Sequence, residues 1–328
     1  MRAIEIFEES GPRSGLRLAE LPEPEASHML TPGEGVVVDV HAAGVSFPEL
    51  LQSRGMYQLR PPLPFVPGSE VGGIVRSAPA GAPVSPGDRV AAFSVLGGWA
   101  ETAVAPAFMC FRLPDALDFA QGAGLILNYH TAWFALKLRG RLETGETVLV
   151  HGAAGGVGTA ALQIAKGLGA RTIAVVSTAE KEQVARAAGA DEVVRSDGAW
   201  KDDVKALGGA DVVLDPVGGD RFTDSLRSLK EDGRLVVVGF TGGAIPEVRV
   251  NRLLLNNVSV VGAGWGAYVM GKPQLNQQIG GALDELIASG HVRPIVGARL
   301  PLERAADALE LLEGRRATGK VVLDVRPD

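Results

Sequence analysis

The sequence has almost no cysteine and no long apolar run. Cys110 is the one cysteine among 328 residues, so neither an intrachain disulfide nor a zinc site built from several cysteines can form. No apolar segment reaches the roughly 20 residues that a membrane-spanning helix needs. The sequence therefore excludes a disulfide-stabilised fold and argues against a membrane protein.

An excess of positive charge is also missing. The 32 lysines and arginines are outnumbered by 38 acidic residues, which leaves a net charge of −6 and disfavours a nucleic-acid-binding function based on phosphate neutralisation. The first residues, MRAIEIFEES, lack the basic and then apolar pattern of a signal peptide. We therefore expect a cytoplasmic protein that binds neither nucleic acid nor membrane.

Glycine is abundant. The chain contains 43 glycines in 328 residues, well above the average share of about 7%, which indicates many tight turns or close backbone approaches. The length suggests about two domains at roughly 150 residues each. Apolar residues at 46% and charged residues at 21% are typical of a globular protein.

The pattern of apolar and turn-forming residues changes near residue 147. Before it, short β-type runs such as 35–40, 72–76 and 89–93 are separated by Pro- and Gly-rich turns, which predicts a mostly β domain. After it, strands alternate with helical patterns, which predicts a parallel sheet covered on both faces. The expected strands are six, the number in a complete dinucleotide-binding sheet: 147–152, 171–177, 191–194, 210–215, 233–239 and 258–264.

Four helices are expected between these strands. The first ends near residue 168, and the others span 180–188, 201–207 and 221–230. The tail contains two more helical patterns, at 275–289 and 302–313, and a final strand at 321–325. Because the six-stranded sheet is already complete, we expect the tail to complete the first domain. The predicted organisation is a mostly β domain at 1–126 and 267–328 around a dinucleotide-binding domain at 127–266.

A glycine-rich turn, VLVHGAAGGVG at 148–158, lies between a buried strand and a helix. The unpaired N–H groups and the dipole of a helix N-terminus favour a diphosphate. Gly155 lets the backbone approach the phosphates, and Gly158 permits close packing of helix and strand. Against the pattern G-x-G-x-x-G the first glycine is Ala153, with Gly152 just before it.

The end of the second strand selects between the two nicotinamide dinucleotides. An NAD-preferring site places Asp or Glu there on the ribose 2′-hydroxyl, whereas this chain has Ser177 and Thr178, with Lys181 close behind. This pattern favours NADPH, because a carboxylate would repel its 2′-phosphate. Ser177 and Glu180 also fit a capping box of the next helix, with Lys181 on its solvated face, and the two interpretations can coexist.

The segment 145–166, GETVLVHGAAGGVGTAALQIAK, resembles the zinc-independent quinone oxidoreductases of the zeta-crystallin group, within the medium-chain dehydrogenase/reductase superfamily. The resemblance continues at 42–57, 64–75, 128–136 and 314–323. It implies an α/β protein in which a six-stranded Rossmann domain is inserted in a GroES-like, mostly β catalytic domain. It also implies a homodimer or homotetramer, with the edge strand at 258–264 as a candidate contact.

The resemblance extends to the place where zinc-dependent members of the superfamily hold a catalytic metal. The matching positions here are Ser46, Ser69 and about Leu127, and serine and leucine are poor zinc ligands. We therefore expect no metal. The five histidines show no ligand spacing, and we expect His151, at the end of a buried strand, to be structural.

The resemblance implies NADPH contacts in several segments. They are Asn128 and Thr131 at the nicotinamide half, Ala154, Gly155, Gly156 and Val157 at the diphosphate, Ser177 and Lys181 at the 2′-phosphate, Val217, Phe240 and Thr241 along the ribose and nicotinamide, and Arg316 from the tail. Arg195 stands where relatives often have a tyrosine beside the adenosine phosphate, and it could act by charge or by stacking.

On the substrate side, Tyr57 and Ser46 are the candidate catalytic hydroxyls, and Tyr57 could equally be an aromatic wall of the pocket. The sequence shows no Ser–Lys or Tyr–Lys pair that reads as a catalytic dyad. Three functions remain open: an NADPH-dependent quinone reductase, a reductase of enones, 2-alkenals or enoyl thioesters, and an NADPH-binding structural protein of crystallin type. Arg54 and Arg60 are the candidates for binding coenzyme A phosphates.

Overall fold

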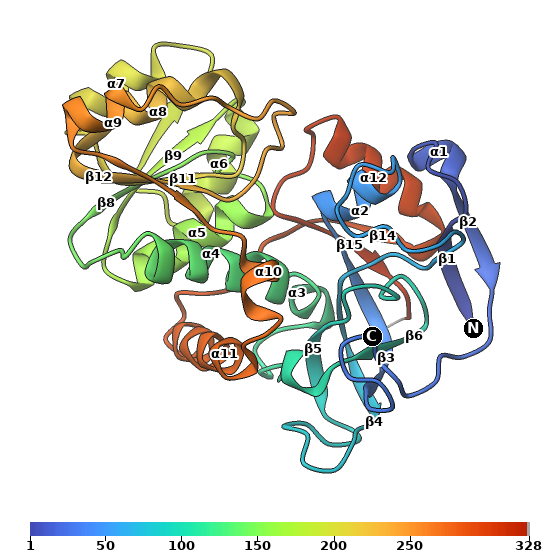
Figure 1. The fold of residues 1–328 in the computed structure, drawn as a ribbon. Helices are drawn as coiled ribbons and strands as arrows, with labels where there is room; N and C mark the ends of the chain where they lie inside the picture. The colour runs from blue at the N-terminus through green and yellow to red at the C-terminus, as the bar shows by residue number, and fades with distance from the viewer. Residues whose placement is uncertain (327–328) are drawn as a thin grey trace. The chain divides into compact units, whose positions relative to one another are not determined.

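The structure is a computed structural model that describes residues 1–326, and its internal contacts divide the chain into two units (Figure 1). The GroES-like unit contains residues 1–127, 273–277 and 294–326, and the Rossmann unit contains residues 128–272 and 278–293. The tail segment 278–293 thus groups by contact with the Rossmann unit. None of the helices described between residues 1 and 326 is long and apolar enough to cross a membrane.

The Rossmann unit is built on a six-stranded sheet in the order β10-β9-β8-β11-β12-β13. The strands are β8 (Thr147–Val150), β9 (Arg171–Val176), β10 (Glu192–Arg195), β11 (Ala210–Asp215), β12 (Leu229–Val237) and β13 (Ser259–Gly262). All neighbouring pairs are parallel. This is the 3-2-1-4-5-6 order of a dinucleotide-binding sheet, so the predicted fold class is confirmed.

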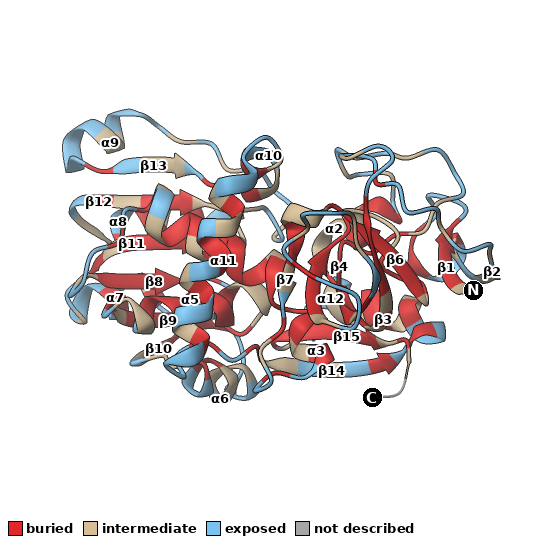
Figure 2. Cartoon of the chain, turned by 90° about the horizontal axis from the view of Figure 1, so that it is seen from below, coloured by how far each residue is buried: buried red, intermediate tan, exposed pale blue. Residues whose placement is uncertain are grey.

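Helices cover the sheet of the Rossmann unit. They are α4 (Thr131–Trp133), η3 (Phe134–Arg139), α5 (Gly156–Gly167), α6 (Ala179–Ala187), α7 (Trp200–Ala206), η4 (Gly219–Arg221), α8 (Phe222–Arg227), α9 (Asn251–Asn256) and α10 (Trp265–Val269). The contact division assigns parts of η2 (Ile126–His130) and α11 (Pro273–Ala288) to each unit. The central strands are buried, whereas α9 and β13 at one end of the sheet are largely exposed (Figure 2).

The region after α8 differs from the sequence prediction. The helix expected at 221–230 ends at Arg227, and β12 begins at Leu229 instead of at 233. The early start is accommodated by a register shift against β11 between Ala210 and Val212. Asp232 bends the strand with a positive φ of 59°. A local irregularity of this kind has no periodic signal in the sequence.

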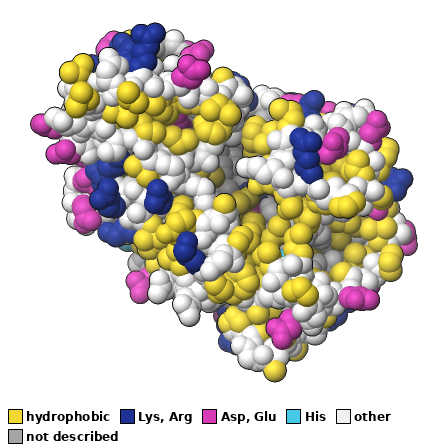
Figure 3. Space-filling model, viewed as in Figure 1, with side chains coloured by type: hydrophobic (Ala, Val, Ile, Leu, Met, Phe, Trp, Pro, Cys, Tyr) yellow, Lys and Arg dark blue, Asp and Glu magenta, His cyan; other side chains and the backbone are white. Residues whose placement is uncertain are grey.

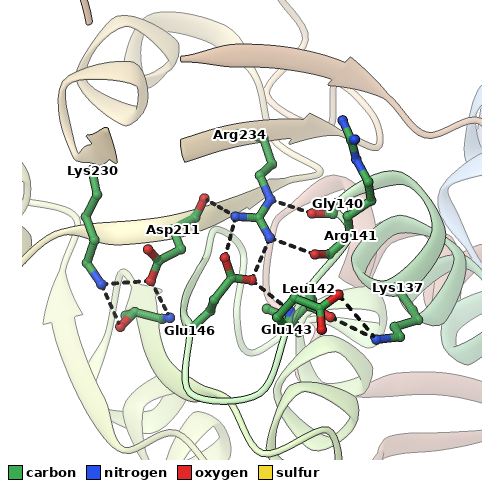
Figure 4. Close-up of polar contacts among 10 residues, drawn as sticks. Lys137, Gly140, Arg141, Leu142, Glu143, Glu146, Asp211, Lys230 and Arg234 are labelled. Carbon is green, nitrogen blue, oxygen red and sulfur yellow. Dashed lines mark hydrogen bonds and ion pairs between the residues drawn. The ribbon is translucent and has the colours of Figure 1, made fainter. Parts of the chain in front are cut away.

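Ion pairs join the strands of the Rossmann sheet near their amino ends (Figure 4). Arg234 on β12 contacts both carboxylate oxygens of Glu146, with its Nη1 2.7 Å from Oε1, and it also donates to the carbonyl oxygens of Gly140 and Arg141. On β11, Asp211 accepts from Lys230 Nζ and from the Thr147 amide, each at 2.7 Å. These contacts link the neighbouring strands β8, β11 and β12 near their amino ends.

The GroES-like unit has a seven-stranded sheet in the order β14-β15-β3-β4-β5-β7, with β6 also paired to β3, and a separate β1–β2 hairpin. Its strands are β1 (Arg2–Ile6), β2 (Leu16–Glu20), β3 (Val36–Val45), β4 (Glu70–Ser77), β5 (Arg89–Phe93), β6 (Thr102–Ala105), β7 (Cys110–Arg112), β14 (Val296–Pro301) and β15 (Lys320–Asp324). The tail strand β15 pairs antiparallel with β3, far earlier in the chain.

The helices of this unit are short. They are α1 (Pro12–Gly15), α2 (Phe47–Gln52), η1 (Ala107–Met109), α3 (Phe119–Gly122), η5 (Leu302–Arg304) and α12 (Ala305–Glu313). One core combines inward-facing residues of β3, β4 and β5 with α12 and β15 of the tail. The tail therefore supplies part of the hydrophobic core of this unit.

Candidate cofactor and substrate site

The glycine turn after β8 is the centre of the site in the Rossmann unit. Gly152 has a positive φ of 58°, and Gly155 is the N-cap of α5, with no side chain capping the helix. The four residues expected at the diphosphate, Ala154 to Val157, lie on this turn and on the first turn of α5. The N-terminus of α5 thus presents its backbone N–H groups to a ligand.

Gly158 holds this turn against the helix. A Cβ atom at this position would lie 2.2 Å from the carbonyl oxygen of Gly152 and 2.7 Å from the Cα of Ala153. Both contacts are with backbone, so no side-chain movement could relieve them. The geometry gives Gly158 the packing role that the sequence predicts.

Asn128 lies beside the diphosphate turn. A Cβ on Gly156 would be 2.5 Å from its amide nitrogen, so the two residues are in close contact. Asn128 and Thr131 are both buried, at 6% and 8% exposure, and lie about one helical turn apart on η2 and α4. Of the two predicted nicotinamide contacts, Asn128 therefore lies against the glycine turn, and Thr131 follows it on the same helical segment.

A basic cluster lies at the carboxyl end of β9. The Lys181 ammonium is 3.5 Å from the Ser177 hydroxyl, and Arg195 Nη2 is 3.3 Å from the Ser177 carbonyl oxygen. Arg195 Nη1 is also 3.8 Å from a Glu182 carboxylate oxygen. The structure thus brings together Ser177 and Lys181, which are predicted at the 2′-phosphate, and Arg195, which the resemblance places beside the adenosine phosphate.

The capping box predicted for Ser177 and Glu180 is wrong by one residue. Thr178 is the N-cap of α6, and its hydroxyl accepts a 3.2 Å hydrogen bond from the Lys181 amide. The helix starts at Ala179, which leaves Ser177 just outside it. The Ser177 hydroxyl is therefore not used by the helix and faces the Lys181 ammonium.

The loops after β11 and β12 border the glycine turn. The Asp215 carboxylate accepts hydrogen bonds from the amides of Val217 at 2.8 Å and Gly218 at 2.9 Å. Thr241 donates from its amide and its hydroxyl to Pro216 O, each at 3.1 Å.

A Cβ on Gly152 would lie 3.3 Å from Val217 Cγ2, so the loop after β11 touches the turn. Phe240, the residue before Thr241, is 37% exposed. The predicted contacts Val217, Phe240 and Thr241 thus gather at the carboxyl edge of the sheet, where open α/β sheets bind ligands.

Asp215 is a site residue that the sequence prediction did not name. It is 1% exposed, and burial raises its pKa, against the effect of the Gly218 and Val217 amides that stabilise the carboxylate. It shapes the loop that carries Val217. An Asp at a strand end, two residues before the predicted contact, is the signal that could have identified it.

In the GroES-like unit, the predicted hydroxyls are close to α2. Ser46 is the N-cap of α2 and is 8% exposed. Tyr57 lies beyond α2 and is partly buried, and burial together with the nearby Glu49 carboxylate raises its pKa. Arg54 forms an ion pair with Glu313, and Arg60 donates to the carbonyl oxygen of Tyr57. Arg54 is thus already paired, which weakens its candidacy as a coenzyme A contact.

The sequence shows no Ser–Lys pair that reads as a catalytic dyad, and the structure brings one serine and one lysine together. Lys320, the first residue of β15, donates to the Ser46 hydroxyl oxygen at 2.6 Å and also pairs with Glu70. The pair spans 274 positions, a separation that no local pattern reveals. Arg316, the predicted tail contact, is exposed and follows α12 in the same unit.

The positions that match zinc ligands are used by other contacts. Ser46 accepts from Lys320, and the amide and hydroxyl of Ser69 donate to Glu49. Within residues 1–326, no group of three or more His, Cys, Asp or Glu side chains could hold a metal ion. The donor set present at this place does not fit zinc.

Comparison with known proteins identifies the family. The alcohol dehydrogenase GroES-like domain family matches residues 32–115, and the zinc-binding dehydrogenase family matches residues 156–280. Quinone oxidoreductase-like protein 2 of Bos taurus is 39% identical over 319 residues, which cover 94% of this chain and 91% of that protein.

Two solved structures extend this comparison. A probable oxidoreductase from Mycobacterium abscessus is 42% identical with a TM-score of 0.87, covering 99% of both chains. The quinone oxidoreductase of Escherichia coli, solved as a complex with NADPH, is 30% identical with a TM-score of 0.88, covering 99% of this chain and 100% of that one.

A chain that contains a Rossmann unit and a GroES-like unit, with a glycine turn at the carboxyl edge of the Rossmann sheet, defines a dehydrogenase or reductase of the medium-chain type. The chain belongs to the quinone oxidoreductase-like group of the medium-chain dehydrogenase/reductase superfamily.

Proposed function

We propose that this protein is an NADPH-dependent oxidoreductase that reduces quinones or related conjugated carbonyl compounds without zinc. The observation that carries the coenzyme assignment is the cluster of Ser177, Lys181 and Arg195 at the end of β9. Two cations beside a hydroxyl suit a phosphate dianion, and Ser177 and Thr178 occupy the strand end where an NAD-preferring site places a carboxylate.

The residues of the Rossmann unit fit the whole coenzyme. The uncapped N-terminus of α5 suits the diphosphate, and the loops after β11 and β12 suit the ribose and nicotinamide. When bound, NADPH supplies the hydride. The protein's own residues bind and orient the coenzyme: Asn128 lies beside the glycine turn, and Thr131 and, from the tail, Arg316 are proposed as further contacts.

The substrate class follows from the donor set in the GroES-like unit. Reduction of an isolated ketone needs a metal or strong donors for the developing oxyanion, and the residues Ser46, Ser69 and Leu127 do not fit zinc. A quinone or an enone delocalises this charge itself. The name of the Escherichia coli relative, quinone oxidoreductase, supports the proposal.

The first experiment measures oxidation of NADPH and of NADH by metal-stripped protein with an ortho-quinone, a para-quinone, a 2-alkenal and a short enoyl thioester. We expect quinone turnover that prefers NADPH and survives chelation. Turnover only with the alkenal or thioester would replace the quinone assignment. NADPH binding without any turnover would instead favour the crystallin-like structural protein.

The coenzyme assignment has its own variants. Lys181→Ala and Arg195→Ala should each weaken NADPH binding about tenfold, because each removes one charge from the 2′-phosphate, and should leave NADH binding unchanged. Lys205→Ala, on the exposed face of α7 in the same unit, is the matched control. Equal losses for both coenzymes would contradict the assignment.

We also propose that the protein forms a homodimer, or a homotetramer built from such dimers, through β13. This strand is at the edge of the Rossmann sheet, where an unpaired strand favours association with another chain. Large apolar side chains lie exposed nearby, at 71–77% exposure, on and before α9: Ile245, Val250, Leu254 and Leu255. Figure 3 shows hydrophobic side chains on this part of the surface. Light scattering should give a mass above that of the monomer, and Leu254→Glu with Leu255→Glu should lower it.

A further inference from the structure

The GroES-like unit contains a buried polar cluster, which we call the Ser46 cluster. Its members are 0–8% exposed: Ser46, Glu49, Ser69, Glu70 and Lys320. By resemblance, Ser46 and Ser69 match positions of zinc ligands in the zinc-dependent members of the superfamily. Burying three ionisable side chains is costly unless each is paired and hydrogen-bonded. A cluster of this kind therefore calls for a physical explanation.

Strand register brings the cluster together. β3 pairs antiparallel with β15 so that Val45 faces Val321, and with β4 so that Ala43 faces Val71. One step further along these ladders, Ser46 meets Lys320, and Gly44 lies opposite Glu70. The central strand β3 thus positions a hydroxyl, an ammonium and a carboxylate from three distant parts of the chain.

Both carboxyl groups of the cluster accept hydrogen bonds, and burial raises the pKa of Glu49. Lys320 Nζ pairs with one oxygen of Glu70, and the other oxygen accepts from the Leu127 amide at 2.9 Å. Glu49 accepts from the amide of Ser69 at 3.0 Å and its hydroxyl at 2.6 Å, and from the Ser46 amide at 2.9 Å. Both carboxylates are therefore held by donors within the protein.

The Ser46 hydroxyl is different, because it is held as an acceptor. Its oxygen accepts from the Lys320 ammonium at 2.6 Å, and a serine hydroxyl has one hydrogen to donate. Among the described residues 1–326, no side chain or carbonyl group accepts that hydrogen. An ammonium on one side of the oxygen directs the hydrogen away from itself and makes the hydroxyl a stronger donor.

We propose that the Ser46 hydroxyl donates a hydrogen bond to the reacting oxygen of the substrate, and that Lys320 is the positioning residue that orients and polarises it. This inference rests on the proposed reduction of a quinone or enone. As the substrate carbon gains hydride, the electron pair of the carbonyl bond moves toward its oxygen. The donor stabilises that charge, and the oxygen then takes its proton from water. The Ser–Lys pair thus supplies the electrostatic stabilisation of the oxyanion without a metal ion.

Kinetics of Ser46→Ala test the donor. We expect kcat for a para-quinone to fall about 10- to 100-fold, as for loss of one oxyanion donor, while the Kd for NADPH, measured by fluorescence, stays unchanged. Across a series of substituted quinones, the variant should depend more steeply on substrate electrophilicity, because the substrate must carry the charge alone. Ser46→Thr, which keeps the hydroxyl, should restore activity. If Ser46 had a purely structural role, the variant would lower kcat equally for all substrates.

A binding measurement tests the same donor without turnover. We expect 4-nitrophenolate, whose charged oxygen resembles the developing oxyanion, to bind the wild-type protein and to bind Ser46→Ala about tenfold more weakly, as followed by its absorbance. Lys320→Met leaves Glu70 buried without its partner, so Lys320→Met with Glu70→Gln is the variant to use. It should reproduce the weak phenolate binding with normal NADPH affinity.

The outcomes separate the two proposals. A wild-type protein that binds NADPH but reduces no acceptor would refute the proposed function, and the phenolate measurement would still decide the role of Ser46. A wild-type protein that reduces quinones, with a Ser46→Ala variant of equal kcat, equal slope and equal phenolate affinity, would overturn the inference about Ser46.

Discussion

Lys320 donates a 2.6 Å hydrogen bond to Ser46 in the interior of the GroES-like unit, although 274 positions separate the two residues. The aliphatic stem of Lys320 reaches Ser46 only because two glycines leave it room. A Cβ on Gly44 would lie 2.9 Å from Lys320 Cε, and one on Gly124 would lie 3.0 Å from its Cγ. The buried lysine and the two glycines form one packing unit.

Gly44→Ala should disrupt this packing unit. The new Cβ would also lie 2.4 Å from the carbonyl oxygen of Ala123 and 2.7 Å from Glu70 Cγ, and the backbone contact cannot be relieved by a rotamer change. We expect the free energy of unfolding to fall by about 2–3 kcal/mol in urea denaturation. Gly124→Ala, whose nearest contacts are with the lysine side chain, should cost less. Equal stability of Gly44→Ala and wild type would contradict the geometry.

The Rossmann sheet could be predicted because its signals are local. Each strand is a short run of buried Val, Ile and Leu next to a helical pattern, and the glycine turn marks where the first strand meets its helix. The predicted contacts Val217 and Thr241 lie in loops after strands, and the parallel topology collects these strand ends at one edge. Segments a few residues long therefore contain most of this information.

The Ser46 cluster could not be predicted for the opposite reason. The pairing of β15 with β3 joins the tail to the first part of the chain, and no periodicity specifies which residue faces which across such a distance. The start of α6 shows the same limit on a smaller scale. Ser177 and Thr178 are both good N-caps, and tertiary structure decides between them.

Gly158→Ala tests the packing of the diphosphate turn. The added Cβ would press on the backbone of Gly152 and Ala153 at 2.2 and 2.7 Å and would displace the turn from α5. We expect NADPH to bind more than about tenfold more weakly, with a loss of about 2 kcal/mol in unfolding free energy. Gly281→Ala, on α11 with no atom within 4 Å of its Cβ, is the control and should be neutral or slightly stabilising. Normal NADPH affinity in Gly158→Ala would show that the turn tolerates the shift.

Arg234→Met tests the strand fastening shown in Figure 4. The guanidinium is largely buried, at 16% side-chain exposure, and its removal leaves Glu146 and three carbonyl oxygens without this donor. We expect a loss of about 3 kcal/mol in unfolding free energy, as for breaking a buried pair. Arg227→Met, which removes an exposed pair with Asp224 on α8, should cost less than about 0.5 kcal/mol. Similar losses in both variants would show that the network contributes little.

His151 should make the stability of the protein depend on pH. Its ring is fully buried, with Nε2 2.8 Å from the Ser225 hydroxyl and its edge against Trp200 at a centroid distance of 5.0 Å. Burial, with a smaller contribution from Arg221, lowers its pKa from 6.5 to about 3. Below about pH 6.5 the His151 ring binds a proton in the unfolded chain but stays neutral in the folded protein. The contribution of His151 to the free energy of unfolding is therefore fully present above that pH. It is lost as the pH falls toward 3, at about 1.4 kcal/mol per pH unit.

The measurement compares wild type with His151→Gln, which can still hydrogen-bond to Ser225 but does not titrate. Because carboxylates dominate below about pH 5, the window is from about pH 6.5 to about pH 5. There the wild type should lose about 2 kcal/mol more unfolding free energy than the variant. His291→Gln, at an exposed histidine of the same unit, should follow the wild-type curve. If His151→Gln and the wild type instead lose the same unfolding free energy over this range, the ring is protonated in the folded protein. In that case its surroundings must open to water.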